Sequence, residues 1–76
     1  MLSKEQIKEK LLGVFYNIPK TKKEFFKGNR DDIYTNTTNM LLAKVYAEIL
    51  EDTNALNRLE ELEKDLFDNK KQSWYN

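Results

Sequence analysis

The chain has 76 residues, 39% hydrophobic and 34% charged, which predicts one small soluble globular domain rather than a disordered segment. It contains no cysteine and no histidine, which excludes disulfides, thiolate sites, histidine-ligated zinc and histidine-based catalytic triads. The 13 basic and 13 acidic side chains cancel to a net charge of zero.

This zero is a cancellation between two oppositely charged halves of the chain. Residues 1–30 contain eight basic and three acidic side chains, a net charge of +5. Residues 31–69 contain three basic and ten acidic side chains, a net charge of −7, and the last seven residues add +2. The pattern predicts a basic front half that faces an acidic helical hairpin.

The apolar runs are too short for a transmembrane helix, and the charged N-terminus lacks the apolar region of a secretory signal. We therefore expect a cytoplasmic protein. Lys and Asn together supply 19 residues, a bias typical of AT-rich genomes, so we expect an origin in a low-GC bacterium or in a phage or other mobile element.

The first predicted helix begins after Ser3, which has the spacing of a capping box with Gln6. Pro19 disfavours helical geometry at the residue before it, so the helix should end near residues 16–17. Gly13 lies inside this helix, where we expect it to mark a close helix crossing. The apolar stripe consists of Ile7, Leu11, Val14, Phe15 and Ile18, broadened by Leu12 and Tyr16.

Residues 19–32 form the connection to the next main helix. Thr21 begins another capping-box pattern and Gly28 is a good helix terminator, so we expect a short extra helix over residues 22–27. Its two aromatic side chains are Phe25 and Phe26.

The second main helix should begin at residues 29–32 and run to about Glu51. At 100° per residue, one narrow sector is polar, and almost all of the remaining surface is apolar or small. Such a helix must be covered on more than one side, which makes it the central helix. The polar sector contains Thr37, Lys44, Glu48 and Glu51, together with Ile33. The apolar remainder contains Tyr34, Met40, Leu41, Leu42, Ala43, Val45, Tyr46, Ala47, Ile49 and Leu50.

The last helix should begin at Asn54 as its N-cap. Because the connection at 52–54 is short, the second and third main helices should form an antiparallel hairpin. We therefore predict an all-α fold of three main helices over residues 1–69, followed by a C-terminal tail over 70–76. The seam of the last helix is formed by Ala55, Leu59, Leu62 and Leu66, widened by Leu56 and Phe67.

A basic segment with interleaved aromatics suggests a nucleic-acid interface, with cations on phosphates and Phe25 and Phe26 stacked on bases. The alternative is a solvated turn whose phenylalanines fill the core. The acidic hairpin and the pI of about 6.3 favour the second interpretation. The basic residues are Lys20, Lys22, Lys23, Lys27 and Arg30.

Two acidic pairs, Glu48 with Glu51 and Glu60 with Glu63, occur on the two arms of the predicted hairpin. Their pattern resembles the magnesium-binding arrangement of all-α nucleotide pyrophosphatases of the MazG and dimeric dUTPase type. The resemblance implies magnesium-dependent nucleotide hydrolysis. The alternative is that both pairs lie on solvated faces of amphipathic helices, in which case no metal, cofactor or catalytic residue is expected.

We favour a non-enzymatic protein-interaction module of the inhibitor, adaptor or immunity type, which binds another protein or a second copy of itself. Bacteriocin immunity proteins are similar in being small helical bundles. Three helices can leave part of the central helix bare, and the tail aromatics can either anchor a partner or fold back on the bundle. The predicted partner-binding residues are Met40, Ala43, Ala47, Leu50, Trp74 and Tyr75.

Overall fold

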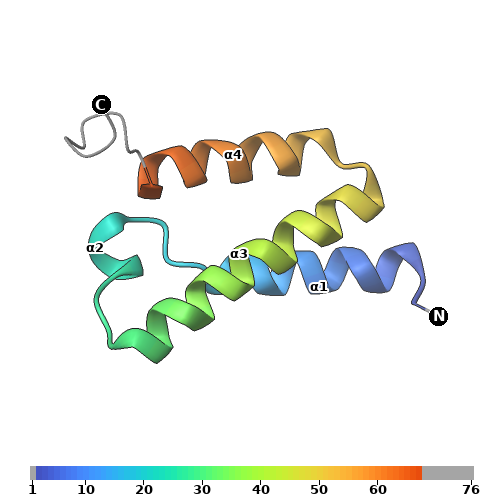
Figure 1. Cartoon of the computed structure of the whole chain (residues 1–76). Coiled ribbons are helices and arrows are strands. Elements are labelled where there is room, and N and C mark those ends of the chain that lie inside the picture. Colours follow the sequence, from blue (N-terminus) through green and yellow to red (C-terminus); the bar gives the residue numbers. More distant parts are fainter. Residues whose placement is uncertain (1, 68–76) are drawn as a thin grey trace.

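The computed structural model describes residues 2–67, of which 82% are helical, with no strand among them. Four helices follow one another along this part of the chain (Figure 1): α1 at Lys4–Asn17, α2 at Lys22–Phe25, α3 at Arg30–Leu50 and α4 at Thr53–Phe67. The predicted all-α bundle is thereby confirmed.

Helix α3 is the centre of the arrangement. Helix α1 packs most extensively on it, α4 packs on it as the second arm of an antiparallel hairpin, and the single turn of α2 contacts α4 (Figure 1). The shortest extent of the molecule is 17 Å, which is the thickness of about two helix layers. Helix α3 therefore forms one layer, and α1 and α4 form the other.

The predicted cap of α1 is confirmed. The Ser3 hydroxyl accepts a hydrogen bond from the Gln6 backbone N–H at 3.2 Å, and the Gln6 side chain accepts one from the Ser3 N–H at 2.9 Å. The helix ends at Asn17, two residues before Pro19, as expected from the missing proline donor. This stop places Ile18, which is 1% exposed, in the core.

The start of α3 is built by a second capping box. The Asn29 side chain accepts from the Asp32 backbone N–H at 3.0 Å, while the Asp32 carboxylate accepts from the Asn29 N–H at 3.2 Å. Gly28 leaves room for this carboxylate, because a Cβ at residue 28 would lie 2.0 Å from Asp32 Oδ2 and 2.6 Å from Asp32 Cβ. Gly28 is therefore required by the cap that follows it.

The turn between α3 and α4 differs from the prediction at its cap. Glu51 adopts a left-handed conformation with φ 54°, and the Asp52 N–H donates to the Ala47 carbonyl at 2.9 Å, which closes the end of α3 in a Schellman arrangement. The Asp52 carboxylate then accepts from the Ala55 N–H at 3.0 Å. Asp52, and not Asn54, is therefore the N-cap of α4, because the left-handed residue brings Asp52 directly to the first turn.

The core fills the space between α3 and the layer formed by α1 and α4. Among the described residues, every buried side chain is apolar. Partly buried side chains extend the core at its edges, among them Val14, Phe15 and Leu56. The buried set is Leu11, Ile18, Phe25, Met40, Ala43, Ala47, Leu59, Leu62 and Leu66.

Gly13 does not lie at a close helix crossing. A Cβ built on it meets no atom within 4 Å, so the expectation of a tight approach on this side of α1 is wrong. Leu12 and Tyr16, expected to broaden the buried stripe of α1, are 61% and 85% exposed. The buried face of α1 is therefore narrower than its sequence pattern predicts.

None of the helices within residues 2–67 is both long and apolar enough to cross a membrane.

Candidate functional site

The arc of α3 predicted as the exposed partner surface lies inside the fold. Met40 is 2% exposed, Ala43 and Ala47 are 0% exposed, and Leu50 is partly buried. The prediction that these residues form a bare surface is wrong, because α1 and α4 cover this side of the helix. Ala43 and Ala47 explain why this side of α3 is the covered one, since their small side chains allow the neighbouring helices to approach closely.

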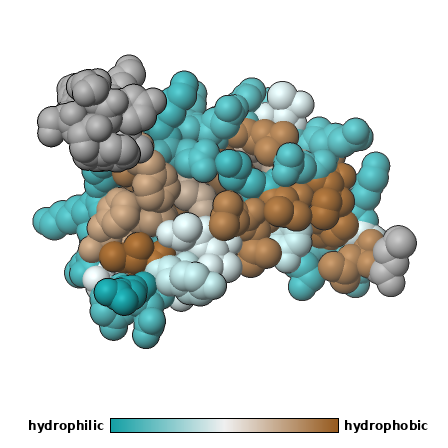
Figure 2. Space-filling view, in the orientation of Figure 1, coloured by the Kyte–Doolittle hydropathy of each residue, from teal (hydrophilic) through white to brown (hydrophobic). Residues whose placement is uncertain are grey.

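The opposite side of α3 is the exposed one. Tyr34 on this side is 72% exposed, Leu41 57% and Ile49 55%. In Figure 2, hydrophobic surface gathers along the side of α3 that faces the viewer, between the more hydrophilic surfaces above and below it. We refer to this surface as the outer face of α3, formed by Tyr34, Leu41, Leu42, Val45 and Ile49 with Thr38 between them.

The outer face follows from the spacing of its residues. Tyr34, Thr38, Leu41, Val45 and Ile49 are separated by four, three, four and four positions, so they line one side of a helix. With Leu42, they occupy a sector about 100° wide at 100° per residue. Between Tyr34 and Ile49, no charged residue falls within the stripe, and Asp31 lies on the same side about one turn before Tyr34. The charge-free length is suitable for contact with another apolar surface.

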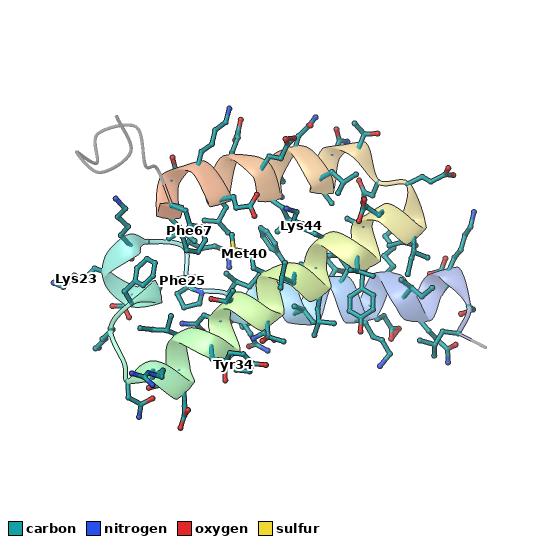
Figure 3. The ribbon with its side chains drawn as sticks, viewed as in Figure 1. Lys23, Phe25, Tyr34, Met40, Lys44 and Phe67 are labelled. Carbon is teal, nitrogen blue, oxygen red and sulfur yellow. The ribbon has the colours of Figure 1, made fainter. Side chains whose placement is uncertain are left out.

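The basic segment is only partly available as a surface. Lys22, Lys23 and Lys27 are exposed around α2, and Arg30 is the first residue of α3. Lys23 projects away from the bundle in Figure 3. Lys20 is engaged elsewhere, so the five basic residues do not form one continuous cationic surface.

Lys20 closes the C-terminal end of α1. Its ammonium donates to the Phe15 carbonyl at 2.6 Å and to the Ile18 carbonyl, and it lies 4.6 Å from the centre of the Phe15 ring. A cation at this end of a helix interacts favourably with the helix dipole, and the Lys20 ammonium adds a second donor to the Phe15 carbonyl, which also accepts from the Ile18 N–H at 3.2 Å. Partial burial lowers the pKa of Lys20 from its ordinary value of 10.5. Lys20 is therefore a structural residue of this helix terminus.

The phenylalanines of the basic segment pack with an aromatic ring from α4. Phe25 is completely buried, and its ring centre lies 4.9 Å from that of Phe26 and 5.4 Å from that of Phe67 (Figure 3). The Phe26 and Phe67 rings meet edge to face at 5.7 Å. Asn36 of α3 donates to the Phe25 carbonyl at 2.9 Å, which fixes α2 against α3. Phe25 is therefore a core residue and offers no free ring face for a nucleic-acid base.

The acidic pairs are not brought together into a metal site. Glu63 of α4 pairs instead with Lys44 of α3, at 3.1 Å between the ammonium and the carboxylate. Within residues 2–67, no three acidic side chains lie close enough to hold a metal ion. The geometry therefore gives no support to the resemblance to magnesium-dependent pyrophosphatases.

A shallow groove of about 240 Å³ opens between α1 and the start of α4. Leu11, Leu12 and Phe15 form its apolar side, and Lys8 and Arg58 lie at its rim. Its acidic group, Asp52, is already occupied in capping α4. The groove is therefore a packing gap with a charged rim, and the outer face of α3 is the more extensive apolar feature.

The predictions for Trp74 and Tyr75 lie outside the described residues. Searches against protein-family models, curated proteins and solved structures found no match to this chain.

Proposed function

We propose that this chain is a non-enzymatic protein-interaction module that binds another polypeptide through the outer face of α3. The observation that supports the proposal is the exposure of five large apolar side chains on one side of one helix. Exposed apolar surface costs about 25 cal/mol per Å² relative to burial, so covering this side is favourable. Grouped exposed apolar residues of this kind are typical of interaction surfaces.

The chemistry of the outer face indicates the kind of partner. Its centre lacks charge, and Arg30 and Glu48 lie at its edge with opposite signs. An apolar helix face or a flat apolar surface with few charges matches it, whereas a polyanion does not. Inhibitor, adaptor and immunity-type proteins act through surfaces of this chemistry, and these are the roles we propose.

Two of the features required for nucleic-acid binding are used by the fold. Lys20 donates to backbone carbonyls of the α1 terminus, and Phe25 is fully buried. The remaining exposed cations of the basic segment support weak, salt-sensitive contact with phosphates at most. Protein binding through α3 is the better-supported proposal.

The proposal is tested by retention of proteins on the immobilised chain from a lysate of its host. Leu41→Glu with Val45→Glu should abolish retention of a specific protein, because two charges enter the apolar stripe. Leu12→Glu with Tyr16→Glu is the matched control, since it also replaces two exposed apolar residues four positions apart. The control should retain the same protein as the unmodified chain.

The retained protein is then purified and its affinity for the three chains is measured by calorimetry. A dissociation constant raised at least tenfold by the α3 variant alone supports the proposal. Equal binding by all three chains would show that another surface is used. Loss of binding on Lys22→Glu with Lys23→Glu alone, together with binding to duplex DNA or RNA, would favour the nucleic-acid alternative.

A further inference from the structure

The outer face of α3 is symmetric in sequence position. Each of its residues has a counterpart at the same distance from the midpoint between Leu41 and Leu42. Thr38 is the counterpart of Val45, and Tyr34 is the counterpart of Ile49, so each pair of residue numbers adds up to the same total. The exposed stripe therefore has the same pattern when it is read in either direction.

A surface of this kind is complementary to itself. In a two-fold symmetric dimer, the same patch is used by both copies, and residue i of one copy meets residue j of the other in both directions. If two α3 helices pack antiparallel about an axis between Leu41 and Leu42, Tyr34 of each copy faces Ile49 of the other. Thr38 then faces Val45, and each apolar position of the stripe meets an uncharged one.

The charges at the edge of the stripe are compatible with this register. Glu48 of one copy faces Thr35 of the other, and Glu48 of one copy is separated from Glu48 of the other by about 20 Å along the helix at 1.5 Å per residue. Between Tyr34 and Ile49, no like charges face each other across the stripe, so its apolar contact is free of their repulsion. Beyond its ends, Asp31 of one copy is the counterpart of Asp52 of the other, and this like-charge pair opposes the register.

The extent of the surface is close to the lower limit for a specific dimer interface. The stripe runs from Tyr34 to Ile49, about 22 Å along the helix. A specific interface needs roughly 1,000 Å² in total, or about 500 Å² from each copy. Five large apolar side chains that are 38% to 72% exposed supply surface of this order.

The composition of α3 supports the same arrangement. The helix is apolar around nearly its whole circumference, which requires cover on more than one side. Within the described residues, α1 and α4 cover one side only, and the structure is two helix layers thick. A second copy would cover the other side and place the two α3 helices at the centre of a four-layer assembly.

We propose that the occupant of the outer face of α3 is a second copy of this chain, packed antiparallel about a two-fold axis between Leu41 and Leu42. This inference rests on the proposed function, in which the same face is the binding surface. It specifies the partner, the orientation and the residues that meet.

The register is tested by cysteine crosslinking, which is free of background because the chain has no cysteine. Tyr34→Cys and Ile49→Cys are made as separate variants. One of them carries an added tag, so that a crosslinked dimer containing one copy of each differs in mass from a dimer of either variant alone. A short bis-maleimide bridges facing positions of packed helices about 8–10 Å apart. In the antiparallel dimer, the two copies of residue 34 are about 22 Å apart.

The mixture of the two variants should give a crosslinked species that contains one copy of each, whereas each variant alone should give none. Leu41→Cys alone should crosslink, since its two copies lie beside the axis. Crosslinking of Tyr34→Cys alone would indicate a parallel dimer and overturn the register. Circular dichroism checks that each variant folds, and Thr38→Cys mixed with Val45→Cys provides a second facing pair.

Light scattering provides the independent measurement. The unmodified chain and Leu12→Glu with Tyr16→Glu should have twice the 9.1 kDa mass of one chain, and Leu41→Glu with Val45→Glu should be monomeric. A monomer at all concentrations, with no crosslinks, would overturn the dimer. If the chain is monomeric but Leu41→Glu with Val45→Glu still abolishes retention of a different protein from the lysate, the outer face is the binding surface and only the identity of the partner is wrong. If this variant retains the same proteins as the unmodified chain, the proposed function is wrong as well.

Discussion

Lys44 of α3 and Glu63 of α4 form an ion pair at 3.1 Å that joins the two arms of the helical hairpin. Lys44 belongs to the narrow polar sector of α3, and the pair shows that this sector borders α4 instead of facing only water. It also removes Glu63 from the acidic pattern that resembled a magnesium site. This contact therefore places the polar sector of α3 beside α4 and assigns the Glu63 carboxylate to an ion pair.

The Lys44–Glu63 pair should contribute modestly to stability. Its side chains are 35% and 36% exposed, so solvent screens their attraction. In a double-mutant cycle with Lys44→Met and Glu63→Gln, we expect a coupling free energy of about 0.2–1 kcal/mol, measured by urea unfolding. The coupling should shrink in 1 M NaCl, and an unchanged value would contradict the ion-pair assignment.

Replacing the two glycines by alanine should change stability in opposite directions. Gly28→Ala drives a Cβ into Asp32 and disrupts the α3 capping box, with an expected loss of about 1 kcal/mol in the free energy of unfolding. Gly13→Ala meets no atom within 4 Å inside a helix, so it should gain about 1 kcal/mol. Thermal unfolding followed by circular dichroism measures both. Destabilisation by Gly13→Ala would show that an unseen neighbour occupies that side of α1.

Phe25 should be far more important for stability than its neighbour Phe26. Phe25 is completely buried, so Phe25→Ala should lower the free energy of unfolding by about 3–5 kcal/mol. Phe26 is 41% exposed, and Phe26→Ala should cost about 1–2 kcal/mol, mainly through lost ring contacts. Chemical denaturation of the two variants compares them directly, and equal losses would contradict the assignment of Phe25 alone to the core.

Lys20 should titrate below 10.5, because burial disfavours its charged form and lowers its pKa. Between the folded pKa and 10.5, the unfolded chain binds more protons at this group, so its contribution to stability rises as pH increases. Nuclear magnetic resonance of the Lys20 side chain, assigned with Lys20→Gln, measures the folded pKa. Titration at 10.5 would contradict the burial of the ammonium, and titration above 10.5 would show that the carbonyls and the Phe15 ring stabilise the charged form more than burial disfavours it.

The helix boundaries could largely be predicted from local chemistry. Ser3 and Asn29 cap their helices through their own side chains, and Pro19 ends α1 through its missing donor, so each signal lies within a few residues of its effect. The start of α4 does not follow from local chemistry alone, because Asp52 and Asn54 are both capable caps. Asp52 becomes the cap because Glu51 before it is left-handed. Glycine and asparagine are the usual residues in this conformation, so a glutamate at this position does not predict it.

The covered side of α3 could not be found from its hydrophobic pattern. A helix that is apolar nearly all round has no single preferred side, so the pattern does not distinguish Leu41 from Met40. The alanines at 43 and 47 were the available signal, because close packing of two helices onto one requires small residues. The Lys44–Glu63 contact depends on how the hairpin arms align, which single-helix patterns do not contain.

The two-residue connection at Glu51 and Asp52 also bears on the order of folding. The entropy cost of closing a loop grows with its length, and this hairpin closes over the shortest connection between the long helices. Helix α1 reaches α3 only through residues 18–29, which include α2. We therefore expect the α3–α4 hairpin to form first and α1 to pack on it afterwards. Helix α1 is synthesised before α3 and α4, but it would be the last of the three to make its tertiary contacts.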